Sequence, residues 1–160
     1  MELKKIIVLS IAVLLLSSIV LAQISFHNSQ KTKKLEVLKG LKAKVYKTPY
    51  CSCCDLHIGY MRSYGIEVEV VEMEDISGIK NSLGVPDELL SCHTTVIKDY
   101  FIEGHVPIEA ISKLIEERPD VKGISLPGMP SGSPGMPGAK EGTFVIYSVD
   151  DGGYSEFMVI

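Results

Sequence analysis

Three of the four cysteines in this chain lie within four residues, at Cys51, Cys53 and Cys54, and the fourth, Cys92, is followed directly by His93. Thiolates are oxidised readily, so such a cluster indicates chemistry rather than packing. Cys51 and Cys54 have the spacing of a C-x-x-C thiol–disulfide centre. Thiolates are also the ligands that select copper(I), zinc and iron–sulfur clusters. The cluster therefore indicates either thiol redox chemistry or a site for a soft metal.

The chain from residue 41 onward predicts an alternation of strands and helices. Apolar patterning places strands at 43–47, 66–73, 94–98 and 100–103, and helices at 52–64, from 75 or 77 to 84, and at 107–117. This order, β-α-β-α-β-β-α, is the thioredoxin topology, in which a C-x-x-C begins the first helix. Two further strands at 143–149 and 154–160 are expected to pair. We therefore predict an α/β, thioredoxin-like fold with an added C-terminal β-hairpin.

The expected topology brings the remaining donors to the C-x-x-C. Cys51 and Cys54 face one side of the first helix at its positive end, which favours thiolates, whereas Cys53 joins them only if the first turn is irregular. The third strand begins beside the C-x-x-C, so Cys92 and His93 face it, at the place where oxidoreductases of this fold carry a cis-proline. We predict one metal site from these residues: Cys51, Cys53, Cys54, Cys92 and His93.

Three other residues are candidates to bind the metal or to lie beside it. The fourth strand returns to the same end of the sheet and brings His105 there, either as a donor or as a turn residue before the last helix. Residues 126–138 are too rich in Pro and Gly for a helix or a central strand, and they carry Met129 and Met136. We expect one or both thioethers of this Pro/Gly/Met loop to approach the metal as soft ligands or as a lid. The alternative is a flexible linker.

Helical spacing also predicts which side chains face the core. In the helix at 52–64 the core positions are Leu56, Tyr60, Met61 and Tyr64. In the helix at 107–117 they are Ile108, Ile111, Leu114 and Ile115. His57 and His27, by contrast, are expected to be surface residues.

The first 22 residues have the layout of an export signal. Two lysines precede an apolar run from Ile6 to Ala22, which ends in a small residue suited to cleavage and just reaches the length of a spanning helix. We predict a signal peptide or N-terminal membrane anchor at 1–22, a linker at 23–40 and the metal-binding domain at 41–160. The domain is then periplasmic or otherwise extracytoplasmic, with membrane contact only through the N-terminal segment.

A series of ordered motifs resembles one known family, the CopG-like metal-binding proteins. The motifs are Lys47–Cys54, Gly84–Pro86, Ser91–Thr94, Ile102–Pro107, Glu117–Pro119 and the loop Pro127–Met136. Members are exported, many are known only as a domain of unknown function, and they are often linked to copper resistance. The resemblance implies a thioredoxin-like fold and copper binding through the Cys cluster and the Cys-His pair. Ser52 stands where the family usually has Gly, and His57 and Tyr60 stand where it tends to have Trp and His.

The sequence leaves three functions open. The first is an exported copper-binding protein of copper resistance or homeostasis. It would hold Cu(I) in a site with enough thiolates to be multinuclear. Interconversion of Cu(I) and Cu(II) would be its one enzyme-like activity. The second is a thiol–disulfide oxidoreductase with Cys51 as nucleophile and Cys54 as resolving thiol. The third is a structural zinc site, although a second C-x-x-C unit is lacking.

Expected partners are metal ions and other copper-handling proteins. A net charge of −4 without a basic cluster argues against nucleic acid.

Overall fold

The computed structural model describes residues 8, 14–26 and 35–160, and the chain divides into two compact units, Met1–Glu36 and Val37–Ile160. In the first unit, residues 14–26 are helical and their side chains are exposed. Within the described residues, no helix combines the length and apolarity that a membrane crossing requires. The signal or anchor at 1–22 and the linker at 23–40 include residues outside those described, as does His27, so these assignments stay predictions.

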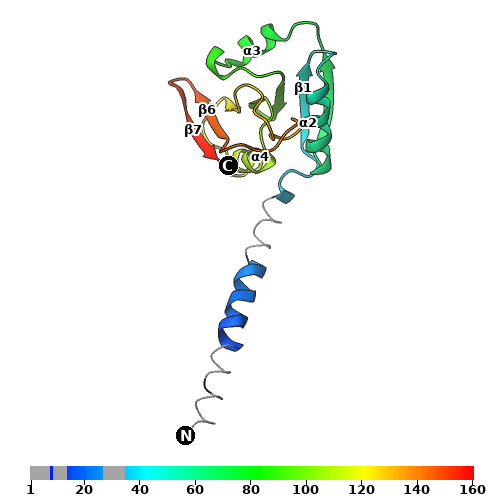
Figure 1. Ribbon diagram of the computed structural model, residues 1–160. Helices are drawn as coiled ribbons and strands as arrows, with labels where there is room; N and C mark the ends of the chain where they lie inside the picture. Colours follow the sequence, from blue (N-terminus) through cyan, green and yellow to red (C-terminus); the bar gives the residue numbers. More distant parts are fainter. Residues whose placement is uncertain (1–7, 9–13, 27–34) are drawn as a thin grey trace. The chain divides into compact units, whose positions relative to one another are not determined.

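The second unit is a mixed α/β fold built on a seven-stranded sheet with strand order β2-β1-β3-β4-β5-β6-β7 (Figure 1). The strands are β1 (Lys42–Lys47), β2 (Glu67–Glu72), β3 (Thr94–Ile97), β4 (Tyr100–Glu103), β5 (Gly123–Ser125), β6 (Val145–Asp150) and β7 (Gly153–Val159). The helices are α2 (Ser52–Ser63), α3 (Ser77–Leu83) and α4 (Ile108–Glu117), with a 3-10 turn, η1, at Asp87–Leu89. The mixed α/β class is confirmed.

Strand pairing explains how distant segments meet. β1 pairs in parallel with β2 and antiparallel with β3, and β3 and β4 form a hairpin. β4 pairs in parallel with β5, which in turn pairs antiparallel with β6 of the C-terminal hairpin. The short strand β5 is absent from the sequence prediction, because three residues beginning with Gly carry no recognisable alternation. It is the strand that joins the hairpin to the rest of the sheet.

The predicted core residues are buried in α4, but most of those predicted for α2 are not. In α4, all four predicted positions are buried. In α2, the buried residues are Cys54, His57, Ile58 and Met61, so only Met61 of the predicted set is buried. Leu56 is 63% exposed. The buried stripe of α2 has the spacing of a helix face, but the cysteine and histidine, not the leucine and tyrosines, lie on it.

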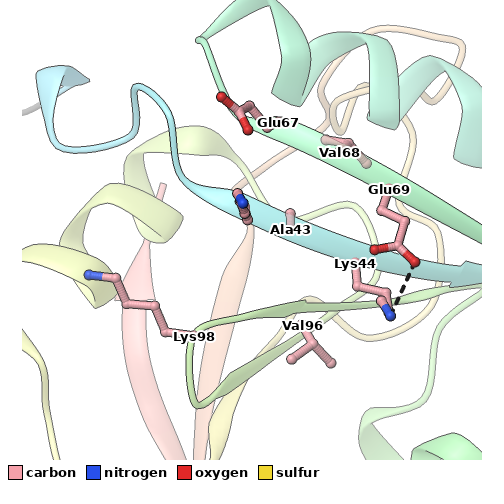
Figure 2. A pocket seen from close by; sticks show the side chains of 8 residues that line it. Ala43, Lys44, Glu67, Val68, Glu69, Val96 and Lys98 are labelled. Carbon is pink, nitrogen blue, oxygen red and sulfur yellow. Dashed lines mark ion pairs between the residues drawn. The ribbon is translucent and has the colours of Figure 1, made fainter.

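A shallow groove crosses β1, β2 and β3 near the start of β1 (Figure 2). Its lining carries charges of both signs, and Lys44 Nζ lies 3.1 Å from Glu69 Oε1. The cysteines follow the opposite end of β1, after Lys47. The groove is therefore separate from the cysteine cluster.

Candidate metal centre

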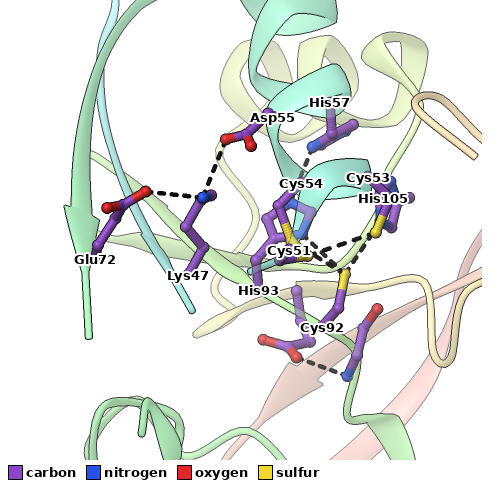
Figure 3. The surroundings of a disulfide bond; sticks show 12 residues. Lys47, Cys51, Cys53, Cys54, Asp55, His57, Glu72, Cys92, His93 and His105 are labelled. Carbon is purple, nitrogen blue, oxygen red and sulfur yellow. Dashed lines mark hydrogen bonds and ion pairs between the residues drawn. A yellow bond between two sulfur atoms is a disulfide. The ribbon is translucent and has the colours of Figure 1, made fainter. Parts of the chain in front are cut away.

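The four cysteine sulfurs come together where β1 ends, α2 begins and the chain enters β3 (Figure 3). Cys51 and Cys54 form a disulfide, with their Cα atoms 5.3 Å apart. The Cys53 sulfur lies 3.5 Å from that of Cys51, and the Cys92 sulfur lies 3.6 Å from that of Cys54. All four sulfurs lie within 4.8 Å of one another. The structure thus brings together the cysteines that the sequence predicted to meet.

The backbone before α2 explains how Cys53 joins the cluster. Cys51 stands outside the helix, with φ −86° and ψ 85°, and Ser52 is the first helical residue. The C-x-x-C is therefore split between a turn and a helix, so Cys51 and Cys53 are not held in helical register. Their sulfurs can approach each other, as the sequence allowed for an irregular first turn.

A second donor group shares Cys92 with the first. The Cys92 sulfur lies 3.2 Å from His93 Nδ1 and 3.1 Å from His105 Nε2. Both imidazoles are buried, and the three donor atoms lie within 4.8 Å of one another. His105 Nδ1 lies 2.7 Å from the carbonyl oxygen of Pro134. A carbonyl only accepts, so Nδ1 donates and Nε2 keeps a lone pair directed at the sulfur.

The tight turn between β4 and α4 places His105. Gly104, with φ +78°, lies so close to the Ser91 side chain and the Leu126 carbonyl that a Cβ would collide with both. Only glycine combines this backbone conformation with this close approach. His105 is thus held with its Nε2 beside the Cys92 sulfur, as well as being the turn residue before α4.

Burial favours the neutral forms of Cys92, His93 and His105, and of the neighbouring His57, when no metal is bound. It lowers the pKa of His57 to about 4, that of His93 well below its usual value, and that of His105 in the same direction. It also raises the pKa of the Cys92 thiol to about 12, with the nearby Cys53 adding to the rise. A metal ion that binds Cys92 must therefore displace its proton, so binding should release protons.

The buried imidazoles should make the metal-free protein sensitive to acid. A histidine whose pKa falls on folding binds protons more readily in the unfolded chain, so stability present above the usual pKa is lost as pH falls toward the folded pKa. For His57 the fall from 6.5 to about 4 corresponds to roughly 3 kcal/mol lost by pH 4. We expect the free energy of unfolding, measured with urea on metal-free protein, to decrease from pH 7 to pH 5. A value that stays constant or rises over that range would contradict burial of neutral imidazoles.

A buried carboxylate holds the segment that carries Cys92 and His93. Glu103 is fully buried and accepts hydrogen bonds from Lys80 Nζ, from Thr94 Oγ1 (2.5 Å) and from the Ser91 backbone N–H (2.7 Å). These contacts fix the residues on both sides of the Cys-His pair. Burial raises the pKa of Glu103, and the Lys80 ammonium opposes this rise. The sequence placed Glu103 near the site, two residues before His105, but it did not predict the burial of Glu103 or its contact with Lys80.

A second buried cation lies beside the disulfide. Lys47 is 1% exposed, and its Nζ lies 3.1 Å from Asp55 Oδ1 and 2.9 Å from Glu72 Oε1 (Figure 3). These contacts join the end of β1 to the first turn of α2 and to β2. Burial lowers the pKa of Lys47, but the two carboxylates outweigh it and raise the pKa overall. Lys47 therefore stays charged and fixes the turn from which the cysteines emerge.

His57 corrects the sequence prediction most directly. It was expected at the surface, but it is fully buried in α2, one turn after the cysteines. Its Nδ1 lies 3.0 Å from His93 Nε2, and its Nε2 lies 3.1 Å from the Val106 carbonyl oxygen. The imidazole therefore sits directly behind a candidate ligand.

The Pro/Gly/Met loop reaches the site through its backbone. Besides the Pro134 carbonyl on His105, Gly135 packs so tightly that a Cβ there would lie 2.7 Å from His57 N and 2.9 Å from Cys53 O. Met129 is 51% exposed and Met136 is partly buried. The metal roles of the two thioethers stay predictions.

The donors fit a soft metal ion. Cys92 offers one thiol proton, but it lies within hydrogen-bonding distance of two ring nitrogens, so one proton cannot serve both contacts. A cation at this position would satisfy the sulfur and both nitrogens. Thiolate and imidazole are ligands that copper accepts.

Comparison with known proteins identifies relatives. The family described as "Protein of unknown function, DUF411" matches residues 89–136, which include the Cys-His pair and most of the Pro/Gly/Met loop. Two solved structures, "Copper resistance protein copG- Form 2" and "Copper resistance protein copG- Form 1", are each 37% identical to this chain and cover 76% of it. The matches cover 99% and 98% of those chains, with TM-scores of 0.71 and 0.70. No curated protein sequence matches the chain.

The resemblance seen in the sequence motifs is therefore confirmed in identity, coverage and fold. Copper-resistance relatives and a Cys/His cluster together suggest metal binding, with copper as the metal. The chain belongs to the family of the copper resistance protein CopG.

Proposed function

We propose that this protein binds Cu(I) at the cysteine cluster and at the adjoining Cys92–His93–His105 group, and that it serves in copper resistance or homeostasis. The observation that carries the proposal is that all four cysteine sulfurs lie within 4.8 Å of one another. Ring nitrogens of His93 and His105 also lie 3.2 and 3.1 Å from the Cys92 sulfur. Soft thiolates select Cu(I) over hard cations. The printed names of the two solved relatives support copper as the metal.

The number of donors favours more than one metal ion. A single tetrahedral ion takes four ligands, as structural zinc does. Here four sulfurs form one group, and Cys92 also belongs to a second group with His93 and His105. A sulfur shared between two groups can bridge two ions. We infer a multinuclear copper site in which Cys53 is a ligand in its own right.

The disulfide makes the site depend on redox state. Cys51 and Cys54 can serve as thiolate ligands only after two electrons have reduced the bond between them. Cys92, His93 and His105 do not need that reduction. We infer that the oxidised protein keeps the smaller donor set and that the reduced protein gains the full cysteine cluster.

The proposal is tested by titrating anaerobic protein with Cu(I) in both redox states, against a chromophoric Cu(I) chelator. The reduced full chain should hold more than one equivalent, and the disulfide form should hold fewer. In the Cys53→Ser variant, the reduced form should lose part of this capacity. If neither form of the wild-type protein keeps copper in the presence of the chelator, the proposed function is wrong.

The second candidate function is thiol–disulfide exchange, and the Cys51–Cys54 disulfide at the start of α2 favours it. The thioredoxin-like arrangement that we infer for β1, α2, β2, α3, β3, β4 and α4 would also suit it. A pure oxidoreductase needs only the two cysteines of the disulfide. Loss of function on replacing Cys53 or Cys92 would favour the metal site, whereas tolerance of both changes would favour exchange.

We further propose that the domain works outside the cytoplasmic membrane. The lysines and the apolar run before residue 23 support export. The apolar side chains described at 14–26 are exposed, as expected of a segment that does not belong to a folded core. Mass spectrometry of the protein from its native host should show either a new N-terminus after residue 22 or the intact chain in the membrane fraction. An intact chain in the cytoplasmic fraction would contradict export.

A further inference from the structure

His57 occupies an interior position between a candidate ligand and the backbone. It is fully buried, and Figure 3 shows it on α2, above His93 in this view. Its ring centroid lies 4.9 Å from that of His93 and 5.2 Å from that of His105. Its two nitrogens are both engaged, Nδ1 with His93 Nε2 at 3.0 Å and Nε2 with the Val106 carbonyl at 3.1 Å. A surface histidine would make neither contact.

These contacts determine which nitrogen of His57 carries the proton. A backbone carbonyl oxygen only accepts hydrogen bonds, so His57 Nε2 must donate to Val106. The partners of the ring, a carbonyl and a second imidazole, bring no negative charge to stabilise an imidazolium in the interior. His57 is therefore neutral, and its Nδ1 carries a lone pair directed at His93.

The tautomer of His57 determines the tautomer of His93. Because His57 Nδ1 accepts, His93 Nε2 must carry the proton and donate. His93 is also fully buried, so its neutral form has its lone pair on Nδ1. That nitrogen is the one 3.2 Å from the Cys92 sulfur. The proton on the far side of His93 thus leaves the near side free to bind a metal.

The tautomer of His105 is fixed by a different contact. Its Nδ1 donates to the Pro134 carbonyl, so its Nε2 faces Cys92. The two candidate ligands therefore present opposite ring nitrogens to one sulfur. A backbone carbonyl fixes one of them, and the side chain of His57 fixes the other.

We propose that His57 is a positioning residue which holds His93 in the Nε2–H tautomer and so directs the Nδ1 lone pair at the metal. The inference rests on the proposed function for the identity of the metal, but the tautomer is a property of the metal-free protein. Without an acceptor behind it, the buried His93 Nε2–H would lack a partner. The ring would then favour a proton on Nδ1, where the Cys92 sulfur can accept it, and metal binding would have to reverse this. Removing such an outer partner of a ligand typically costs 10–100-fold in metal affinity.

Three substitutions separate the contacts of His57. In His57→Asn, the amide oxygen can take the place of Nδ1 and accept from His93. In His57→Gln, the amide nitrogen can take the place of Nε2 and donate to Val106. His57→Phe keeps an aromatic ring of similar size without either contact. Asn and Gln are matched in chemistry and differ by one methylene, so they distinguish an acceptor for His93 from general polarity or packing.

The primary measurement is the tautomer of His93 in reduced, metal-free full chain, read from two-bond proton–nitrogen NMR correlations on histidine-labelled protein. We expect Nε2–H in the wild type and in His57→Asn, and a shift toward Nδ1–H in His57→Gln and His57→Phe. Cu(I) affinity measured against the chelator should fall about 10–100-fold in the Gln and Phe variants and stay within roughly threefold in the Asn variant.

Two results would overturn the inference. One is a wild-type His93 that carries its proton on Nδ1. The other is an Asn variant that loses the tautomer and the affinity as fully as the Phe variant does. If His57→Phe fails to fold, the Asn and Gln pair still decides between the alternatives. A wild-type protein that binds no Cu(I) would refute the proposed function, while the NMR measurement would still test the role of His57.

Discussion

Replacing Cys92 with serine is expected to lower Cu(I) affinity by at least about 100-fold, beyond the 10–100-fold typical of an outer partner of a ligand. Cys92 is the residue that both donor groups share, so its loss removes one ligand from each. A serine hydroxyl is a hard donor and does not replace a soft thiolate toward Cu(I). The measurement is retention of copper by anaerobic, reduced protein during competition with a Cu(I) chelator.

The chain offers a matched control in the same cluster. Ser52 lies between the cysteines but is exposed, so Ser52→Ala changes a hydroxyl beside the site without removing a donor. Its copper retention should equal that of the wild type. Equal retention by the Cys92→Ser variant would mean that the two segments do not share a metal site.

Replacing Glu103 with alanine is expected to lower the free energy of unfolding by roughly 3–5 kcal/mol, as for other buried ion pairs that lose one partner. The change leaves the Lys80 ammonium buried without its carboxylate and removes the acceptor of Thr94 and of the Ser91 N–H. Urea unfolding of reduced, metal-free protein measures the loss. The Cys92–His93 segment should also lose order, seen as faster amide hydrogen exchange there.

Two controls accompany this prediction. Glu69→Ala breaks the Lys44–Glu69 pair, in which both side chains are largely exposed, and should cost less than about 1 kcal/mol. The double variant Lys80→Met, Glu103→Leu removes both buried charges and should recover much of the loss. A Glu103→Ala variant no less stable than Glu69→Ala would show that the buried pair does not hold the segment.

The fold was predictable where one face of an element is plainly apolar. The four isoleucine and leucine positions of α4 follow the helical period, and all are buried. α2 has a weaker pattern, because its buried face includes Cys54 and His57 whereas Leu56 points to solvent. Sequence reasoning assigned burial by hydrophobicity, and a helix that carries a functional site on its inner face breaks that rule.

The candidate site was also predictable only in part. Chain order alone brought the cysteines, His93 and His105 to one end of the sheet, because strand direction determines where each segment begins. The supporting roles of Lys47, Lys80, Glu103 and His57 were not predicted, since charged and polar side chains are usually exposed. Their burial depends on partners far away in sequence, such as the contact of Lys80 with Glu103 or of His57 with Val106. Such pairings are visible only after the chain has folded.

The most direct test of the account is copper K-edge X-ray absorption on reduced full chain loaded with Cu(I). If the cysteine cluster and the Cys92–His93–His105 group hold the metal, the nearest scatterers should be mainly sulfur, with a smaller imidazole contribution that decreases in a His93→Ala, His105→Ala variant. A first shell made of nitrogen and oxygen alone, in protein that retains copper against the chelator, would contradict the proposed site.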